Sequence, residues 1–273
     1  MGKRWIVYPY HVWMAIFTVV PLALIFFYAF TMPGEMRFTF TNIQRVMESL
    51  YLEVLLRSIY LAAISTLLCF LVGYPMAMIL AETSVKYRSM LVLMIVIPMW
   101  MNFLLRTYAW MTLLERKGLI NSVLMYLHLP TINILYTDYA VVLGMVYNFL
   151  PFMILPIYSV LMKMDKNLLE AAGDLGADKW TCFRKITFPL SLPGVYAGML
   201  MVFMPAVTTF VISRLLGGGQ YTLIGNLIEQ QFLAVGDWNF GSSLSVVMMI
   251  LILCSLGFMT RYEKENEGGG MFW

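Results

Sequence analysis

Charged side chains are scarce in this chain of 273 residues. Asp, Glu, Lys and Arg make up only 12% of it, whereas 61% is hydrophobic and the mean hydropathy is +0.78. A chain with so little polar surface does not fold as a soluble globule. The net charge of +3 comes without a basic tract that carries interleaved aromatic residues, so nothing indicates a nucleic-acid partner. The composition indicates an integral membrane protein whose surroundings are lipid.

Cysteine, histidine and the motifs of catalysis are also scarce or missing. The three cysteines are an odd number, with Cys69 and Cys254 in apolar stretches, so neither a disulfide framework nor a thiolate metal site is expected. His11 and His128 are too few and too far apart for a histidine metal site. The phosphate loop, H-E-x-x-H and G-x-S-x-G patterns do not occur. We therefore expect no catalytic site, no metal and no cofactor bound by this chain.

Long apolar stretches are what the sequence has instead. A transmembrane helix needs about 20 largely apolar residues, and six stretches meet or approach that length. They predict an all-α integral membrane protein, with one transmembrane domain over residues 1–273. We expect spans near residues 10–31, 58–81, 89–112, 139–162, 194–213 and 239–260, a polar loop over 163–190 and a mobile tail over 262–273.

The distribution of Lys and Arg predicts the orientation. With six spans both termini lie on one side, and that side collects the basic residues near both termini, Lys86, Arg88 and five more around the 163–190 loop. The other side has fewer. Because loops rich in Lys and Arg stay inside, both termini and this loop are predicted to be cytoplasmic.

The polar loop has the pattern of two short helices joined by a sharp turn. Apolar residues recur every three to four positions up to Leu175, and a second stripe begins at Trp180. Gly176 lies between them and supplies the left-handed backbone that a tight helix-to-helix turn needs. We expect Pro189 to stop the second helix.

The spacing within this loop resembles the EAA loop of bacterial ABC importer permeases, in which an E-A-A triplet is followed at fixed distances by G, I and P. The matching residues are Glu170, Ala171, Ala172, Gly176, Ile186 and Pro189, with Phe188 where the family usually has Leu. The resemblance implies a six-span type I importer permease (MetI-like) whose cytoplasmic coupling helix docks into an ATPase subunit. Glu170 would make a charged contact there and Gly176 would form the turn.

Further stretches look like the polyamine branch of this family, in particular the PotB-type subunit of spermidine/putrescine importers. They include residues 97–108 (IPMWMNFLLRTY), 150–158 (LPFMILPIY) and 224–241 (IGNLIEQQFLAVGDWNFG). The resemblance implies a second, PotC-like permease subunit, a homodimeric PotA-like ATPase that binds ATP and Mg, and a periplasmic PotD-like polyamine-binding protein. It also implies a bacterial inner-membrane location and alternating access driven by the ATPase.

A pathway for polyamines should offer carboxylates and aromatic faces, because both attract ammonium groups. Candidates in or beside the spans are Trp100, Tyr108, Tyr147, Asp237 and Trp238, of which Asp237 beside Trp238 is the strongest. An interfacial or packing role stays open for each aromatic residue.

Three polar residues lie at the depth of the lipid. Asn102 and Asn148 either face the lumen or form interhelical hydrogen bonds. Arg106 would repel a polycation, so we expect it to extend to the membrane surface or to pair with a carboxylate.

Two alternatives stay open. A permease for another solute, such as sulfate, molybdate, iron or a sugar, would share the loop but not the aromatic and acidic pathway. A self-contained channel or secondary carrier would work without nucleotide and should carry ionisable residues deep in its spans, whereas the only candidate is Arg106, near the end of a span.

Overall fold

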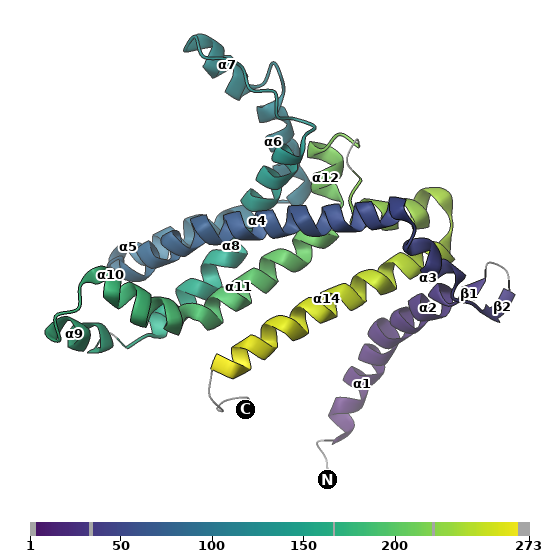
Figure 1. Cartoon of the computed structure of the whole chain (residues 1–273), viewed down its shortest axis with the longest axis horizontal. Helices are drawn as coiled ribbons and strands as arrows, with labels where there is room; N and C mark the ends of the chain where they lie inside the picture. The colour runs from purple at the N-terminus through teal and green to yellow at the C-terminus, as the bar shows by residue number, and fades with distance from the viewer. Residues whose placement is uncertain (1–3, 33–34, 166, 220–221, 267–273) are drawn as a thin grey trace. The chain divides into compact units, whose positions relative to one another are not determined.

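The computed structural model describes residues 4–32, 35–165, 167–219 and 222–266, and these are almost entirely helical (Figure 1). The chain forms two compact units. The first comprises Met1–Leu56 with Ile224–Cys254, and the second Arg57–Leu223 with Ser255–Trp273.

The first unit joins the N-terminal helices to the helices near the C-terminus. Its elements are α1 (Arg4–Met14), the π-helical stretch η1 (Ala15–Val19), α2 (Val20–Ala29), strands β1 (Thr31–Met32) and β2 (Glu35–Phe38), α3 (Thr41–Val46), the start of α4, α13 (Ile224–Gln230), the π-helical stretch η3 (Gln231–Val235) and most of α14 (Trp238–Asn266).

Polar side chains of α14 attach it to the end of α2. The Asn239 amide donates to the carbonyl of Tyr28 at 3.0 Å and to that of Thr31 at 2.8 Å, and the Ser243 hydroxyl donates to the Ala29 carbonyl at 3.0 Å. Tyr28 and Ala29 lie in the last turn of α2 and Thr31 follows it, where carbonyls lack their usual intrahelical donors. Side chains of α14 therefore bind these carbonyls, and the Asn42 amide also donates to those of Ala29 and Thr31. The antiparallel pair β1–β2 follows directly.

The second unit contains the remaining helices. They are the rest of α4 (Ser49–Glu82), α5 (Val85–Trp100), α6 (Phe103–Leu114), α7 (Leu119–Tyr126), α8 (Asp138–Lys163), α9 (Asn167–Asp174), α10 (Lys179–Cys182), the π-helical stretch η2 (Phe183–Thr187), α11 (Phe188–Thr208) and α12 (Val211–Leu216).

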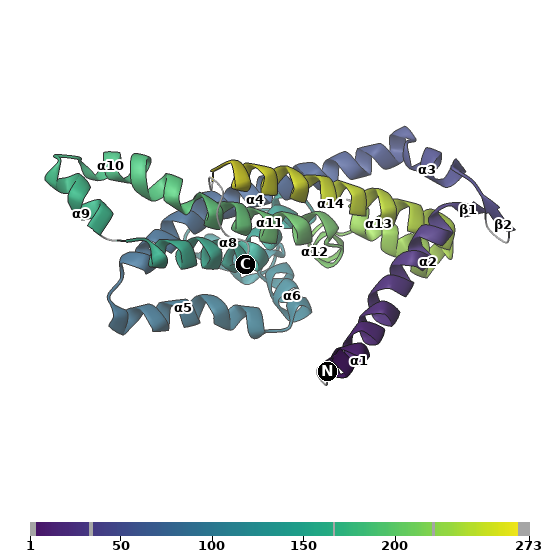
Figure 2. The same ribbon diagram turned by 90° about the horizontal axis from the view of Figure 1, so that it is seen from below.

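Helices α8 and α11 lie side by side along most of their length, as Figures 1 and 2 both show. Small residues allow this close approach. A Cβ atom added at Gly198 would lie 2.9 Å from the Met153 sulfur, and one at Gly194 would lie 2.9 Å from the Pro156 carbonyl oxygen. The central side chains of α8 and α11, such as Met153 and Val202, are fully buried.

Five helical segments of the described chain are long and apolar enough to cross a membrane, namely residues 8–29, 49–82, 138–163, 179–208 and 238–257. Up to six are present if α5 and the helices after it count as one broken span. Our expectation of one span over 89–112 differs from the structure, since the chain bends by 93° between α5 and α6. Met101 is extended, and the Asn102 side chain accepts from the Leu104 backbone at 2.9 Å, which starts a new helix.

Two other predicted boundaries also differ. The predicted span over 194–213 ends earlier, because Thr209 is extended and α12 begins as a separate helix at Val211. The predicted tail over 262–273 begins within α14, which continues to Asn266, and residues 267–273 lie outside the described part of the chain.

Candidate functional site

The EAA segment, residues 167–189, forms two helices joined by a tight turn, as its sequence predicts. Helix α9 ends at a left-handed Gly176 with φ of 82°. The Gly176 amide donates to the Gly173 carbonyl at 2.8 Å and the Ala177 amide to the Ala172 carbonyl at 3.0 Å. This is the paired hydrogen-bond pattern of a Schellman cap, and it reverses the chain sharply.

Asp178 starts the second helix. Its backbone is extended and its side chain accepts a hydrogen bond from the Thr181 backbone amide at 3.3 Å, which makes it the N-cap of α10. Hydrogen bonding from Thr181 lowers the pKa of the Asp178 carboxyl below its usual value. The carboxylate is therefore the form that caps this helix.

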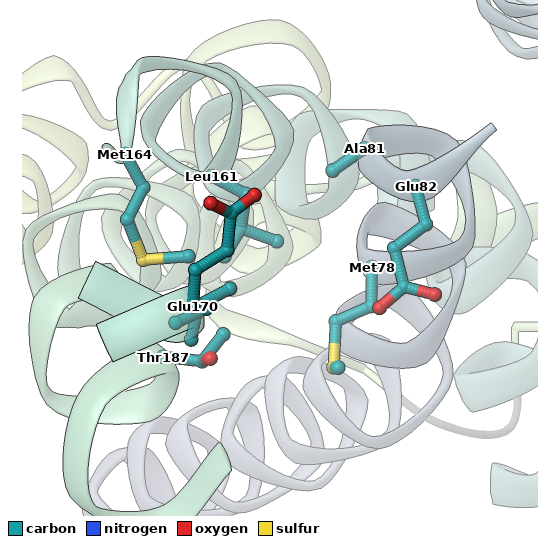
Figure 3. Close-up of a pocket in the computed structure, with 8 residues that line it drawn as sticks. Met78, Ala81, Glu82, Leu161, Met164, Glu170 and Thr187 are labelled. Atoms are coloured by element: carbon teal, nitrogen blue, oxygen red, sulfur yellow. The ribbon is translucent and has the colours of Figure 1, made fainter. Parts of the chain in front are cut away.

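The EAA segment presents apolar side chains outward. Leu175 is 90% exposed and Trp180 is 66% exposed, with the Trp180 ring stacked on Phe183 at 5.5 Å between centroids. Exposed aromatic and aliphatic side chains next to a sharp turn are suited to contact another protein. Glu170 is also exposed and lines a cavity of about 350 Å³ together with Glu82 of α4 (Figure 3).

Our expectation that Pro189 stops the second helix is wrong. The helix runs from Lys179 through η2 and α11 to Thr208, and Pro189 occupies the first turn of α11. The missing N–H of Pro189 is tolerated because the preceding residues 183–187 are wound as a π-helix, so the hydrogen-bond pattern already changes there. The segment is thus joined rigidly to the membrane helix that follows it.

A buried hydrogen bond holds this junction, which sequence reasoning missed. The Tyr74 hydroxyl of α4 lies 2.8 Å from the Ser191 hydroxyl of α11, and Ser191 also donates to the Phe188 carbonyl at 2.8 Å. The Tyr74 ring contacts both Phe183 and Phe188. A tyrosine in an apolar stretch gives no sequence signal for such a long-range contact.

The predicted pathway residues divide between the two units. Asp237 and Trp238 belong to the first unit, where Trp238 packs edge-on against Phe232 at 5.4 Å between ring centroids. Asp237 caps α14 by accepting from the Phe240 amide and forms an ion pair with Arg45 at 3.1 Å. The Arg45 guanidinium also lies 4.1 Å from the centroid of the Phe240 ring.

The other predicted pathway residues belong to the second unit. Tyr147 of α8 contacts the Trp110 ring of α6 at 5.2 Å between centroids. Trp100 is 80% exposed and Tyr108 is 46% exposed, and neither makes an aromatic contact within the described residues. No ring contact therefore joins these three aromatic residues within the described part of the chain.

Arg106 differs from our expectation. It does not extend to the surface, since only 8% of it is exposed, and no carboxylate pairs with it within the described residues. Its Nε and Nη1 atoms are buried without a hydrogen-bond partner.

The two asparagines at the depth of the lipid bind their own helices. Asn102 is exposed and caps α6. Asn148 is buried, and its amide nitrogen donates to the Gly144 carbonyl of α8.

No group of three or more His, Cys, Asp or Glu residues placed to hold a metal ion occurs among the described residues. The described residues instead combine helices long and apolar enough to cross a membrane with an exposed, capped helix pair that carries the EAA pattern. This combination indicates a transport permease.

The comparisons agree with this class. Residues 73–264 match the family described as "Binding-protein-dependent transport system inner membrane component", and the chain belongs to this family. It is an inner-membrane permease component of an ABC transporter.

Among its relatives is the spermidine/putrescine transport system permease protein PotB of Escherichia coli K12, 41% identical over 88% of this chain and 90% of the relative. PotB of Haemophilus influenzae is 38% identical over 92% and 91%. The inner membrane ABC transporter permease protein YdcU of Escherichia coli K12 is 31% identical over 85% and 78%.

A solved structure shares the fold. A chain of a bacterial alginate ABC transporter, in complex with an alginate pentasaccharide-bound periplasmic protein, superimposes with a TM-score of 0.82. The match covers 98% of this chain and 97% of that chain at 16% identity, so it concerns the fold alone.

Proposed function

We propose that this chain is a permease subunit of an ATP-driven importer of polyamines such as spermidine and putrescine. The observation that carries the proposal is the identity of 38–41% to PotB permeases over about nine tenths of the chain. The YdcU relative and the alginate transporter are less similar, at 31% and 16%. We therefore prefer a polyamine as the cargo over sulfate, molybdate, iron or a sugar. We also prefer a permease that is coupled to an ATPase over a self-contained channel or carrier.

The EAA segment would couple the permease to its motor. An ATPase subunit in the cytoplasm would receive the exposed face around Leu175 and Trp180, with Glu170 as the charged contact. Because the second helix continues into α11, a displacement of the segment is passed to a membrane helix without a flexible joint. ATP-driven closure of the ATPase would then open the pathway alternately outward and inward.

The remaining parts of the importer follow from this role. A second, PotC-like permease subunit would complete the pathway, a PotA-like ATPase dimer would bind ATP and Mg, and a PotD-like periplasmic protein would deliver the polyamine. This chain would bind no cofactor itself. The EAA segment and both termini would lie on the cytoplasmic side, a proposal supported by the basic residues around the segment.

Cation recognition would involve Asp237. In the first unit Asp237 already holds the guanidinium of Arg45, with the Phe240 ring beneath it. The position of this guanidinium, between a carboxylate and an aromatic face, supports a role for this corner in binding a cation. A polyamine ammonium that uses Asp237 must therefore compete with Arg45.

Uptake by the assembled transporter tests the proposal. Proteoliposomes that contain this chain with its copurified partners, ATP inside and the binding protein outside should accumulate labelled spermidine, and unlabelled putrescine should compete. Sulfate, molybdate, iron and sugars should not. Competition by one of those solutes instead, or spermidine flux through this chain alone without ATP, would contradict the proposal.

A further inference from the structure

Two side chains on neighbouring helices of the second unit are buried with incomplete hydrogen bonding. Arg106 of α6 leaves two donor nitrogens, Nε and Nη1, without acceptors. Asn148 of α8 leaves one acceptor, Oδ1, without a donor. Within the described residues no other buried side-chain nitrogen or oxygen atom lacks a partner. In apolar surroundings such groups are costly unless they are paired.

The helices that carry them lie against each other in a known register. The Trp110 and Tyr147 rings are in contact, and Leu114 and Leu143 line one small cavity, so α6 and α8 run antiparallel here. Arg106 lies one turn before Trp110 on the same face of α6. Asn148 directly follows Tyr147. The long side chain of Arg106 therefore starts about one turn of α8 from Asn148.

The chemistry of the two groups is complementary. The Asn148 amide nitrogen donates to the Gly144 carbonyl at 2.8 Å, which leaves its oxygen to accept from elsewhere. Pro151, which is inside α8, has no N–H and so cannot bond to the Tyr147 carbonyl as an ordinary residue would. Helix α8 thus offers two oxygen acceptors at the level of an arginine with two unpaired donor nitrogens.

We propose that Arg106 and Asn148 form a hydrogen-bonded latch between α6 and α8 in one state of the transport cycle, and that the latch is open in the present structure. The inference rests on the proposed alternating-access function. The backbone around both residues is suited to such a change, since α6 begins at the 93° bend after α5 and α8 contains Pro151 and Pro156. Arg106 is then a positioning residue and does not contact the cargo.

A double-mutant cycle in the assembled transporter tests the latch. Spermidine uptake and ATPase activity stimulated by the binding protein are measured for wild type, Arg106→Met, Asn148→Leu and the double variant. Each single change should lower uptake at least fivefold. Uptake by the double variant should be no lower than uptake by the less active of the two single variants, because both changes remove the same interaction. Losses that multiply, or a single variant with full activity, would overturn the proposal.

Controls separate the latch from folding and from the proposed function. Thr112→Val alters an exposed hydroxyl on the same helix, bonded to its own backbone, and should leave uptake unchanged. If the Met or Leu variant does not reach the membrane, Arg106→Leu and Asn148→Ala, which also remove the hydrogen-bonding groups, complete the same cycle. If the wild-type complex imports no spermidine, the proposed function fails, and the cycle is then decided on stimulated ATPase activity alone.

The dependence on state has its own readout. The melting temperature of the purified complex is measured without nucleotide and after trapping with ATP and vanadate. Asn148→Leu should lower it in only one of the two states, because the latch exists in only one. An equal decrease in both states, or in neither, would overturn the proposal.

Discussion

Replacing Gly176 with alanine tests the turn of the EAA segment at its least tolerant position. The glycine has φ of 82°, and a Cβ atom added there would meet nothing within 4 Å. The cost is therefore that of left-handed backbone alone, about 1–2 kcal/mol for a residue with a side chain. Since about 1.4 kcal/mol corresponds to a factor of ten, the turn should lose roughly 5- to 30-fold in population. Gly176→Val should cost more, because its side chain is β-branched.

Gly173→Ala is the matched control. Gly173 lies three residues earlier in α9, has no positive φ, and also has nothing within 4 Å of an added Cβ. Alanine there should stabilise the helix by roughly 0.5–1 kcal/mol. The assay is ATPase activity of the assembled transporter, stimulated by the loaded binding protein, with equal amounts of each variant in the membrane. Gly176→Ala and Gly176→Val should lose stimulation and Gly173→Ala should keep it; full stimulation in the valine variant refutes the reasoning.

Four further changes have defined outcomes. Gly144→Ala should lower the melting temperature of the complex, because its Cβ would lie 2.4 Å from Leu216 and overpacking costs about 1–3 kcal/mol. Asp138→Asn breaks a half-exposed ion pair, so we expect at most about 1 kcal/mol of stability lost in a denaturant titration. Asp237→Asn should raise the spermidine concentration for half-maximal uptake, and an unchanged value would remove it from the pathway. Folding lowers the pKa of Asp178, so the stability that its carboxylate gives to the capped helix is complete above the usual pKa of aspartate and is lost only as the pH falls through the lower folded value. The stimulated ATPase activity of Asp178→Ala, relative to wild type, should therefore be reduced equally at pH 6 and pH 8.

The sequence was sufficient where a local rule applies. A 20-residue apolar run can satisfy its backbone in lipid only as a helix, which is why the apolar runs predict α4, α8 and α14. A glycine between two apolar stripes predicts the turn at Gly176, since few other residues adopt that backbone. The family motif lies on the same segment, so the type of protein also follows from a short stretch of residues.

Other properties did not follow from the sequence. Apolar residues continue on both sides of Met101 and Asn102, and they masked the local signal for the 93° bend, which is the cap that Asn102 gives to a new helix. Pro189 carries a helix-stopping signal, but it lies in the first turn of α11, directly after the π-helical stretch η2, and the helix continues through it. The burial of Arg106 likewise depends on how α6 packs, which composition cannot encode.

The central claim is that the EAA segment is a cytoplasmic docking site for an ATPase. It is tested most directly with Leu175→Cys, at a position 90% exposed, in a variant whose three native cysteines are replaced by serine. A membrane-impermeant maleimide should label Cys at this position in inside-out vesicles stripped of the ATPase, and rebinding of the ATPase should protect it. Labelling in right-side-out vesicles, or labelling that the rebound ATPase leaves unchanged, would contradict the account.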